Sequence, residues 1–164
     1  MARGDAEFVE FVRAASGRLA HAAFLMTGDH HQAEDATQTA LVRTYASWSR
    51  VRQDDAYGYA RRVMVNHIVD TWRRPIRELP SDDVPHRRSA DVADEVADRR
   101  WLHSVLGSLS PRERAIVVLR YYFDLAEQQV ARELDVSVGT VKSTSSRALE
   151  KLRQTHLEVH GRDR

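Results

Sequence analysis

Residues 125–153 read LAEQQVARELDVSVGTVKSTSSRALEKLR, and this stretch decides the fold. Its first apolar residues recur at helical spacing and predict a short helix. The inward residues expected there are Val130, Ala131 and Leu134. A tight turn at 135–136 follows, and Ser137 is placed to cap a second helix. The inward residues expected in that helix are Val141, Ala148, Leu149 and Leu152. The stretch therefore predicts a helix-turn-helix, in which two short helices cross closely.

The turn and the outward face of the second helix both suit contact with DNA. Ala131 is small where the helices approach, and Asp135 falls where the chain needs a left-handed residue, a conformation that Asp tolerates. The outward face has no acid before Glu150, and its N-terminal part can enter the major groove. The candidate DNA-contacting residues are Ser137, Val138, Gly139, Thr140, Lys142, Ser143, Ser146 and Arg147. A helical hairpin with a solvated polar face is the less favoured alternative.

The N-terminal half is also patterned as helices. Between residues 8 and 26, apolar residues recur at intervals of four and three, which makes one stripe on a helix. Gly28 suits the end of this helix, and Asp29 suits the cap of the next. Residues 49–55 lack a helical stripe and predict a polar loop. A third helix is expected from about residue 56 to 74, and its polar stripe holds Arg62, Asn66, Asp70 and Arg73.

A break in composition divides the chain into two units. Residues 75–90 contain three of the four prolines and predict a flexible linker. A further amphipathic helix is expected from about 91 to 107, and Ser110 followed by Pro111 is a strong start signal for the next one. The sequence thus predicts an all-α protein with helical domains at 1–74 and 91–160. Residues 154–164 are polar, and we expect that tail to be disordered.

Composition excludes several classes of protein. The chain has no cysteine, which excludes disulfides and thiolate metal sites, and no apolar run approaches the length of a membrane span. Its net charge of +1 does not by itself indicate a nucleic-acid binder. No motif of an enzyme occurs, and we expect no catalytic residue, cofactor or metal. The acid–histidine cluster at 29–35 offers only His30 and Glu34 on one face, which is too few ligands for a metal.

The second helix of the predicted helix-turn-helix carries a specific resemblance. Residues 137–143 (SVGTVKS) and 146–153 (SRALEKLR) resemble region 4 of the extracytoplasmic-function (ECF) sigma factors of bacterial RNA polymerase, and 109–114 (LSPRER) resembles its start. In that family the module recognises the −35 promoter element. Asp135 stands where the family usually has glycine. Thr144-Ser145 replaces a common Arg-Leu pair and so removes a cation from the DNA-facing helix.

The N-terminal half resembles region 2 of the same family. Residues 33–41 resemble the helix that docks on the β′ clamp helices, and the residues implied in this contact are Asp35, Gln38, Leu41 and Val42. Residues 59–74 resemble the segment that reads and melts the −10 element. The loop from Trp48 to Asp55 matches the position of the family's pocket for an extruded base. The residues implied in contact with the −10 element are Trp48, Arg61, Arg62, Asn66, Asp70, Arg73 and Arg74. The alternatives are a solvated face for the first set and helix capping for Asn66 and Asp70. We expect Trp72 to belong to the core.

The resemblance implies a cytoplasmic, non-enzymatic sigma factor of the actinobacterial ECF type, which binds core RNA polymerase and directs promoter-specific transcription initiation. The implied partners are the β′ clamp helices and β flap of the polymerase, promoter DNA and an anti-sigma factor, without membrane insertion. A stand-alone helix-turn-helix regulator is the first alternative, but residues 1–90 show no sensory-domain pattern. A helical adaptor that never touches DNA is the second, and it leaves the arginine stripe unexplained.

Overall fold

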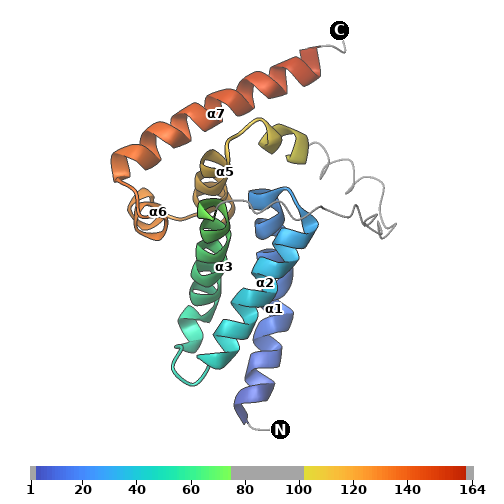
Figure 1. Ribbon diagram of the computed structural model, residues 1–164, viewed down its shortest axis with the longest axis vertical. Helices are drawn as coiled ribbons and strands as arrows, with labels where there is room; N and C mark the ends of the chain where they lie inside the picture. The colour runs from blue at the N-terminus through green and yellow to red at the C-terminus, as the bar shows by residue number, and fades with distance from the viewer. Residues whose placement is uncertain (1–2, 75–101, 162–164) are drawn as a thin grey trace, which may run out of the picture.

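The computed structural model describes residues 3–74 and 102–161, and every regular element within them is helical (Figure 1). The elements are α1 (Arg3–Thr27), α2 (His30–Ala46), η1 (Gln53–Asp55), α3 (Ala56–Arg73), α5 (Pro111–Val117), η2 (Val118–Tyr122), α6 (Glu127–Leu134) and α7 (Val138–Gly161). Residues 102–107 form one more short helical stretch. Among the described helices, none is both long and apolar enough to cross a membrane. The predicted all-α class is confirmed.

The first three long helices form an N-terminal bundle in which α2 packs against both α1 and α3. Small side chains line their contacts, and all are almost fully buried: Ala15, Ala22, Ala23, Ala33, Ala36, Ala40 and Ala60. Because alanine extends so little from the backbone, the helices can approach closely along these seams. Larger residues such as Leu19, Met26 and Met64 fill the space between the seams and are 0% exposed. The apolar stripe expected along residues 8–26 therefore faces the core.

The helix ends follow the capping signals in the sequence. Gly28 adopts a φ of +67°, which glycine accommodates without strain, and it ends α1. The Asp29 carboxylate accepts a hydrogen bond from the Gln32 amide at 3.0 Å and caps α2. Ser110 does the same for α5 by accepting a bond from the Glu113 amide at 3.2 Å, with Pro111 in the first turn. All three predicted boundaries are confirmed.

In the C-terminal unit, α5 passes into a π-helical turn, η2, before the chain reverses into α6. The Phe123 amide donates to the Val118 carbonyl at 3.1 Å, which is the wider bond of that turn. Then α7 packs across α5 and α6, and in Figure 1 it crosses above the N-terminal bundle. The Lys151 ammonium donates to the Glu113 carboxylate at 2.8 Å and ties α7 to α5.

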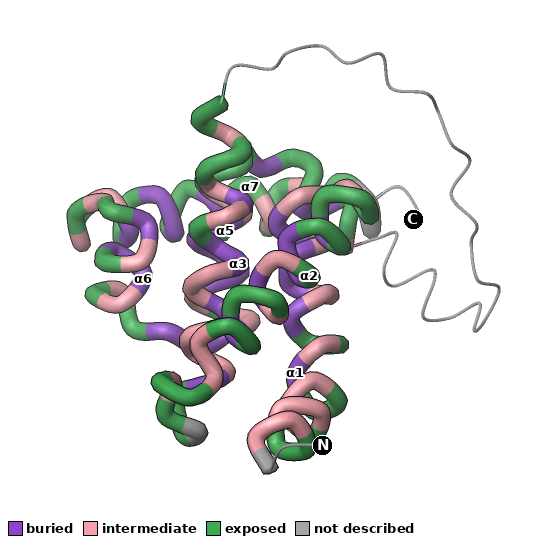
Figure 2. Tube along the Cα trace, turned by 60° about the horizontal axis from the view of Figure 1, so that its bottom comes forward, coloured by how far each residue is buried: buried purple, intermediate pink, exposed green. Residues whose placement is uncertain are grey.

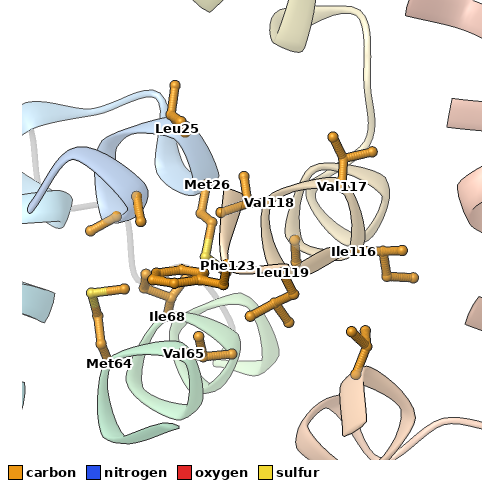
Figure 3. Close-up of a cluster of buried hydrophobic side chains, with 14 of the residues drawn as sticks. Leu25, Met26, Met64, Val65, Ile68, Ile116, Val117, Val118, Leu119 and Phe123 are labelled. Atoms are coloured by element: carbon orange, nitrogen blue, oxygen red, sulfur yellow. The ribbon is translucent and has the colours of Figure 1, made fainter. Parts of the chain in front are cut away.

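The two units share one hydrophobic core. α1 contacts α5 and η2, while α3 contacts α6, so a single cluster of buried residues runs through both units. In Figure 2 the buried stretches, in purple, occur in the N-terminal helices and also in α5 and α6. In Figure 3 the Phe123 ring of the C-terminal unit points among Met26 of α1 and Ile68 of α3. The structure thus contains the two expected helical domains. The exact domain limits stay a prediction, and the predicted linker lies outside the described residues.

Two details differ from the sequence-based expectation. Leu149 was expected to face inward, but it is 38% exposed, while its neighbour Ala148 is fully buried. The buried face of α7 is narrow because α5 and α6 cover only one side of it. The tail expected to be disordered from residue 154 instead continues α7 as far as Gly161. Glu150 stabilises this extension locally by accepting hydrogen bonds from Arg153 at 3.1 Å and Gln154 at 3.4 Å.

The left-handed residue in the helix-turn-helix gives the first testable prediction. Asp135 has a φ of 53°, and glycine adopts this conformation without steric cost. We expect Asp135→Gly to raise the free energy of unfolding by about 0.5 kcal/mol, since relief of strain is partly offset by the greater freedom of the unfolded chain. Urea denaturation measures this. Asp135→Ala is the matched control and should be destabilising, because alanine keeps the Cβ strain and lacks the short polar side chain that makes this conformation tolerable for Asp.

Candidate nucleic-acid interface

The helix-turn-helix is closed by backbone bonds at its turn. The Val136 amide donates to the Ala131 carbonyl at 3.0 Å, and Asp135 supplies the left-handed residue between the helices. The Ser137 hydroxyl then accepts a hydrogen bond from the Thr140 amide at 3.0 Å and caps α7. Val130 of α6 and Val141 of α7 are 0% exposed at the crossing. The predicted turn and cap are therefore confirmed, and α7 is held at a fixed angle.

The first three turns of α7 present a polar face to solvent. Lys142, Ser143, Ser146 and Arg147 are exposed, and so is Gly139 at the start of the helix. The Lys142 ammonium lies 3.8 Å from the Glu127 carboxylate, and its side chain remains 65% exposed. Such a weak surface pair is easily exchanged for a phosphate. This face combines mobile cations with small hydroxyls, as a helix that enters the major groove requires.

Thr144 and Ser145 lie on the opposite side of α7. Their exposed fractions are 3% and 7%, so their side chains point into the core and not toward a groove. The Thr144 hydroxyl accepts a bond from Arg147 at 3.4 Å, while the buried Ser145 hydroxyl has no partner among the described residues. The substitution relative to the family pattern therefore alters the interior of this unit, and the outer face does not lose a cation at these positions.

A second polar surface runs along α3. Asn66, Asp70, Arg73 and Arg74 are exposed, and Arg62 is partly exposed one turn earlier. The Arg62 guanidinium donates to the Asp55 carboxylate at 2.9 Å, and both side chains remain open to solvent. Among the described residues, no hydrogen bond of the Asn66 or Asp70 side chain caps or cross-links a helix. The helix thus presents a stripe of cations and hydrogen-bonding groups.

The structure differs from expectation at Arg61. This arginine was placed on the DNA-contacting surface, but it is only 6% exposed. Its Nη2 donates to the Glu133 carboxylate of α6 at 2.6 Å, and its guanidinium lies 5.7 Å from the centre of the Phe123 ring. A residue's helical position predicts the direction in which its side chain points, but not the partner that covers it. In this conformation Arg61 is sequestered between the two units.

The loop between α2 and α3 forms a hollow of about 370 Å³ beside this stripe. Its lining residues are Ser47, Arg50, Val51, Arg52, Asp55 and Tyr59. Trp48 is partly buried and packs on the rings of Phe8 and Phe11, with centroids 5.1 and 5.3 Å away. Tyr59 was not singled out from the sequence, yet its hydroxyl donates to Ser47 at 3.1 Å and holds one wall. Trp72 packs against the core, as expected.

The residues expected to face the polymerase lie along α2. Val42 is 68% exposed, which is unusual for an apolar side chain on a helix, whereas Leu41 packs partly into the core. Gln38 donates to Glu34 at 3.3 Å, and Asp35 lies 2.9 Å from the imidazole of His67. The sequence did not indicate Tyr45, which extends the same exposed surface at 50% exposure. Hydrogen bonding to Asp5 raises the pKa of Tyr45 above its ordinary value.

The acidic and histidine side chains of residues 29–35 do not converge on one point, and two of them make structural contacts. Asp29 caps α2, and the His30 ring stacks on Phe24 with centroids 4.3 Å apart. Within the described ranges, no group of three or more acidic or histidine side chains is arranged to hold a metal ion.

Taken together, these surfaces define a DNA-binding protein made of two helical modules, one of which is a helix-turn-helix. Residues 11–77 match the family model "Sigma-70 region 2", and residues 99–152 match "Sigma-70, region 4". The chain is 39% identical to an RNA polymerase sigma-E factor of Streptomyces avermitilis over 99% of this chain and 91% of that protein.

Two further relatives agree. An ECF RNA polymerase sigma factor, SigE of Mycolicibacterium smegmatis, is 31% identical over 88% of this chain and 59% of that protein. The fold also resembles the sigma factor RpoE of Bartonella quintana, solved with the anti-sigma factor NepR, with a TM-score of 0.63, 18% identity, and coverage of 90% and 94% of the two chains. The chain belongs to the ECF sigma factors of RNA polymerase. It binds core polymerase and directs promoter-specific transcription initiation, so a stand-alone regulator is not favoured.

The exposed face of α7 leads to a prediction about salt dependence. Lys142→Ala should weaken binding to promoter duplex and lower the slope of log K against log salt by about one unit, because one phosphate contact is lost. Fluorescence anisotropy at several salt concentrations measures the slope. The only other lysine, Lys151, is held against Glu113 on α5, so Lys151→Ala is the matched control and should leave the slope unchanged. An unchanged slope for Lys142→Ala would exclude it as a phosphate contact.

Proposed function

We propose that the two polar surfaces divide promoter recognition between them, with α7 reading the −35 element and α3 the −10 element. The observation that carries this proposal is the exposed, acid-free N-terminal face of α7. The residues assigned to the −35 element are Ser137, Val138, Gly139, Thr140, Lys142, Ser143, Ser146 and Arg147. The glycine and the serine and threonine side chains are small, which lets the helix approach base edges. Lys142 and Arg147 contact flanking phosphates.

The α3 surface suits a strand that has left the duplex. Arg62, Arg73 and Arg74 supply cations for the phosphates, and Asn66 and Asp70 supply hydrogen-bonding groups for an exposed base edge. The neighbouring hollow beside Tyr59 has the aromatic wall and the arginines that an extruded base requires. Trp48 stands at the base of this loop and supports it through Phe8 and Phe11. Arg61 belongs to the same proposed set, although in this structure its side chain is buried against Glu133.

The α2 surface is the proposed contact with the polymerase. Val42 gives an exposed apolar centre, and Asp35 and Gln38 surround it with acceptors and donors. A small apolar centre with a polar rim is the usual composition of a protein interface. We assign it to the β′ clamp helices and place the second polymerase contact, with the β flap, on the C-terminal unit. The protein acts without catalysis of its own, in the cytoplasm where the polymerase works, and an anti-sigma factor holds it inactive.

The α2 assignment is tested by a charge placed at the apolar centre. Val42→Asp should weaken binding to core RNA polymerase on the order of tenfold, because it buries an unpaired carboxylate in the interface. Gel filtration and a competition assay with labelled core measure this. Arg43→Ala changes the next exposed residue, which points away, and should retain affinity. Equal affinities for the two variants would remove α2 from the interface. Failure of the unmodified, anti-sigma-free protein to co-elute with core would remove the polymerase assignment altogether.

The α3 assignment is tested by separating melting from core binding. Asn66→Ala and Arg73→Ala should each reduce open-complex formation about tenfold while core binding stays intact, since both residues face DNA only after melting. A promoter is first identified by transcribing a genomic fragment library with the unmodified protein and core polymerase. Permanganate footprinting on that promoter then measures the melted DNA. Thr71→Ala, on the same helix, is the control, because its hydroxyl donates to the Ile68 carbonyl and is not assigned to DNA. Normal footprints with both variants would contradict the assignment.

A further inference from the structure

A glycine stands in the first turn of α3, where the helix backbone does not require one. Gly58 is the third residue of α3. Glycine is less favourable than alanine inside a helix, because it loses more backbone freedom on folding. Among the described residues, Gly28 alone is a glycine with a positive φ, so Gly58 has an ordinary backbone conformation. The reason for glycine at this position therefore lies in its surroundings.

The space beside Gly58 is filled by a carboxylate. A Cβ atom on residue 58 would lie 2.7 Å from Asp55 Oδ1 and 3.3 Å from Arg62 Nη1. A carbon and an oxygen at 2.7 Å overlap, so the carboxylate would have to shift. The other oxygen, Asp55 Oδ2, accepts a hydrogen bond from Arg62 Nη2 at 2.9 Å. Gly58 thus leaves the room in which Asp55 reaches Arg62.

Asp55 also forms part of the wall of the hollow between α2 and α3. It is the only acid among the lining residues of that hollow, whereas Arg62 is not among them and lies on the polar stripe of α3 with Asn66. The carboxylate therefore links the hollow to the stripe. A negative charge here repels the phosphates of a DNA strand, so it is unfavourable for affinity unless it serves the geometry of the surface.

We propose that Asp55 is a positioning residue, which holds the Arg62 guanidinium at a fixed place beside the hollow and so couples phosphate contact to base recognition. This inference rests on the proposed −10 role of α3. A guanidinium has several N–H donors, so Arg62 can hold Asp55 and a phosphate together. The two side chains are 39% and 58% exposed, which leaves them open to an incoming strand.

The fixed position of Arg62 affects selectivity and affinity in opposite directions. With Arg62 held, a strand gains this phosphate contact only when its extruded base lies in the hollow at the matching distance. A freely moving Arg62 would contact a phosphate of any strand and add nothing to selectivity. Asp55 therefore lowers the affinity for single-stranded DNA in general and raises the preference for the correct sequence.

The test is binding of single-stranded oligonucleotides by the holoenzyme, assembled from the full chain and core polymerase. Selectivity is the affinity for the −10 strand of the identified promoter divided by the affinity for a scrambled strand. Asp55→Asn should bind the scrambled strand more tightly and lose selectivity by about threefold, which is the scale of an exposed ion pair. Unchanged selectivity would overturn the proposal.

Asp54→Asn is the matched control for the lost charge. Asp54 is the neighbouring acid, it pairs with Arg52 at 3.3 Å, and it does not line the hollow. This variant should tighten binding to both strands equally and keep the selectivity. An equal loss of selectivity in Asp54→Asn and Asp55→Asn would show that charge alone sets the preference, and would overturn the positioning role.

A second variant separates position from charge. Gly58→Ala keeps every charge but puts a Cβ atom where the Asp55 carboxylate lies, so selectivity should again fall by about threefold. The variant should fold, because alanine favours a helix more than glycine does. Gly17→Ala is the matched control, since a Cβ atom there meets nothing within 4 Å, and it should retain selectivity. Normal selectivity in Gly58→Ala would contradict the proposal.

Dependence on Arg62 distinguishes positioning from a general role of Asp55 in the loop. In an Arg62→Ala protein there is no guanidinium to hold, so adding Asp55→Asn should cause no further loss of selectivity. A further loss would show that Asp55 acts elsewhere and would overturn the inference. Failure of the −10 assignment gives a different result, because Arg62→Ala alone would then bind both strands as the unmodified protein does.

Discussion

The rest of the structure depends on one shared apolar core. Each unit comprises about 60 to 70 residues, a size at which a domain buries too little surface to be more than marginally stable. Phe123 compensates by entering the N-terminal unit beside Met26 and Ile68, and it joins two small cores into one (Figure 3). The buried alanines of α1, α2 and α3 let these helices pack closely against one another.

That shared core explains where the polar groups lie. A contact between units made only of apolar residues would be stable but difficult to reopen, because each exposed ring costs free energy in water. Here the boundary also holds Arg18 and the Arg61–Glu133 pair, which regain full hydration when the units part. Burial raises the pKa of Tyr122, with the Arg18 guanidinium opposing the rise, so the tyrosine remains a neutral hydrogen-bond donor at physiological pH. The composition of this boundary is that of a reversible contact.

Much of the fold follows from local signals in the sequence. The caps at Asp29, Ser110 and Ser137 and the left-handed Asp135 depend on neighbours within a few residues, and all were predicted. The polar stripes of α3 and α7 follow from helical periodicity in the same way. The helical tail after residue 154 was missed because its stabilising pairs are weak individually, and the inward side of Thr144 was missed because a family comparison gives residue types and no directions.

The partner of the buried Arg61 could not have been predicted from periodicity, since it lies 72 positions away. On α3, Arg61 is in line with the buried Val65 and Ile68 at intervals of four and three, so the helical stripe already places it on the inward side. The signal that could have found it was Glu133, an acid beside the inward residues of α6, where a carboxylate requires a cation. An acidic residue on the inward side of an otherwise apolar helix therefore indicates that a cation from a distant part of the chain packs against it.

The two units can separate on binding only if the partner meets one condition. A partner shifts the equilibrium toward the open protein only if it binds that state more tightly than the closed one. The α7 face and Val42 are exposed in the closed state, so DNA or polymerase contacts confined to them give no such preference. Contacts that span both units, or that require Arg61, do give it. The proposed polymerase contacts fall on both units, and so do the two promoter elements, so a partner of either kind that engages both units at once favours their separation.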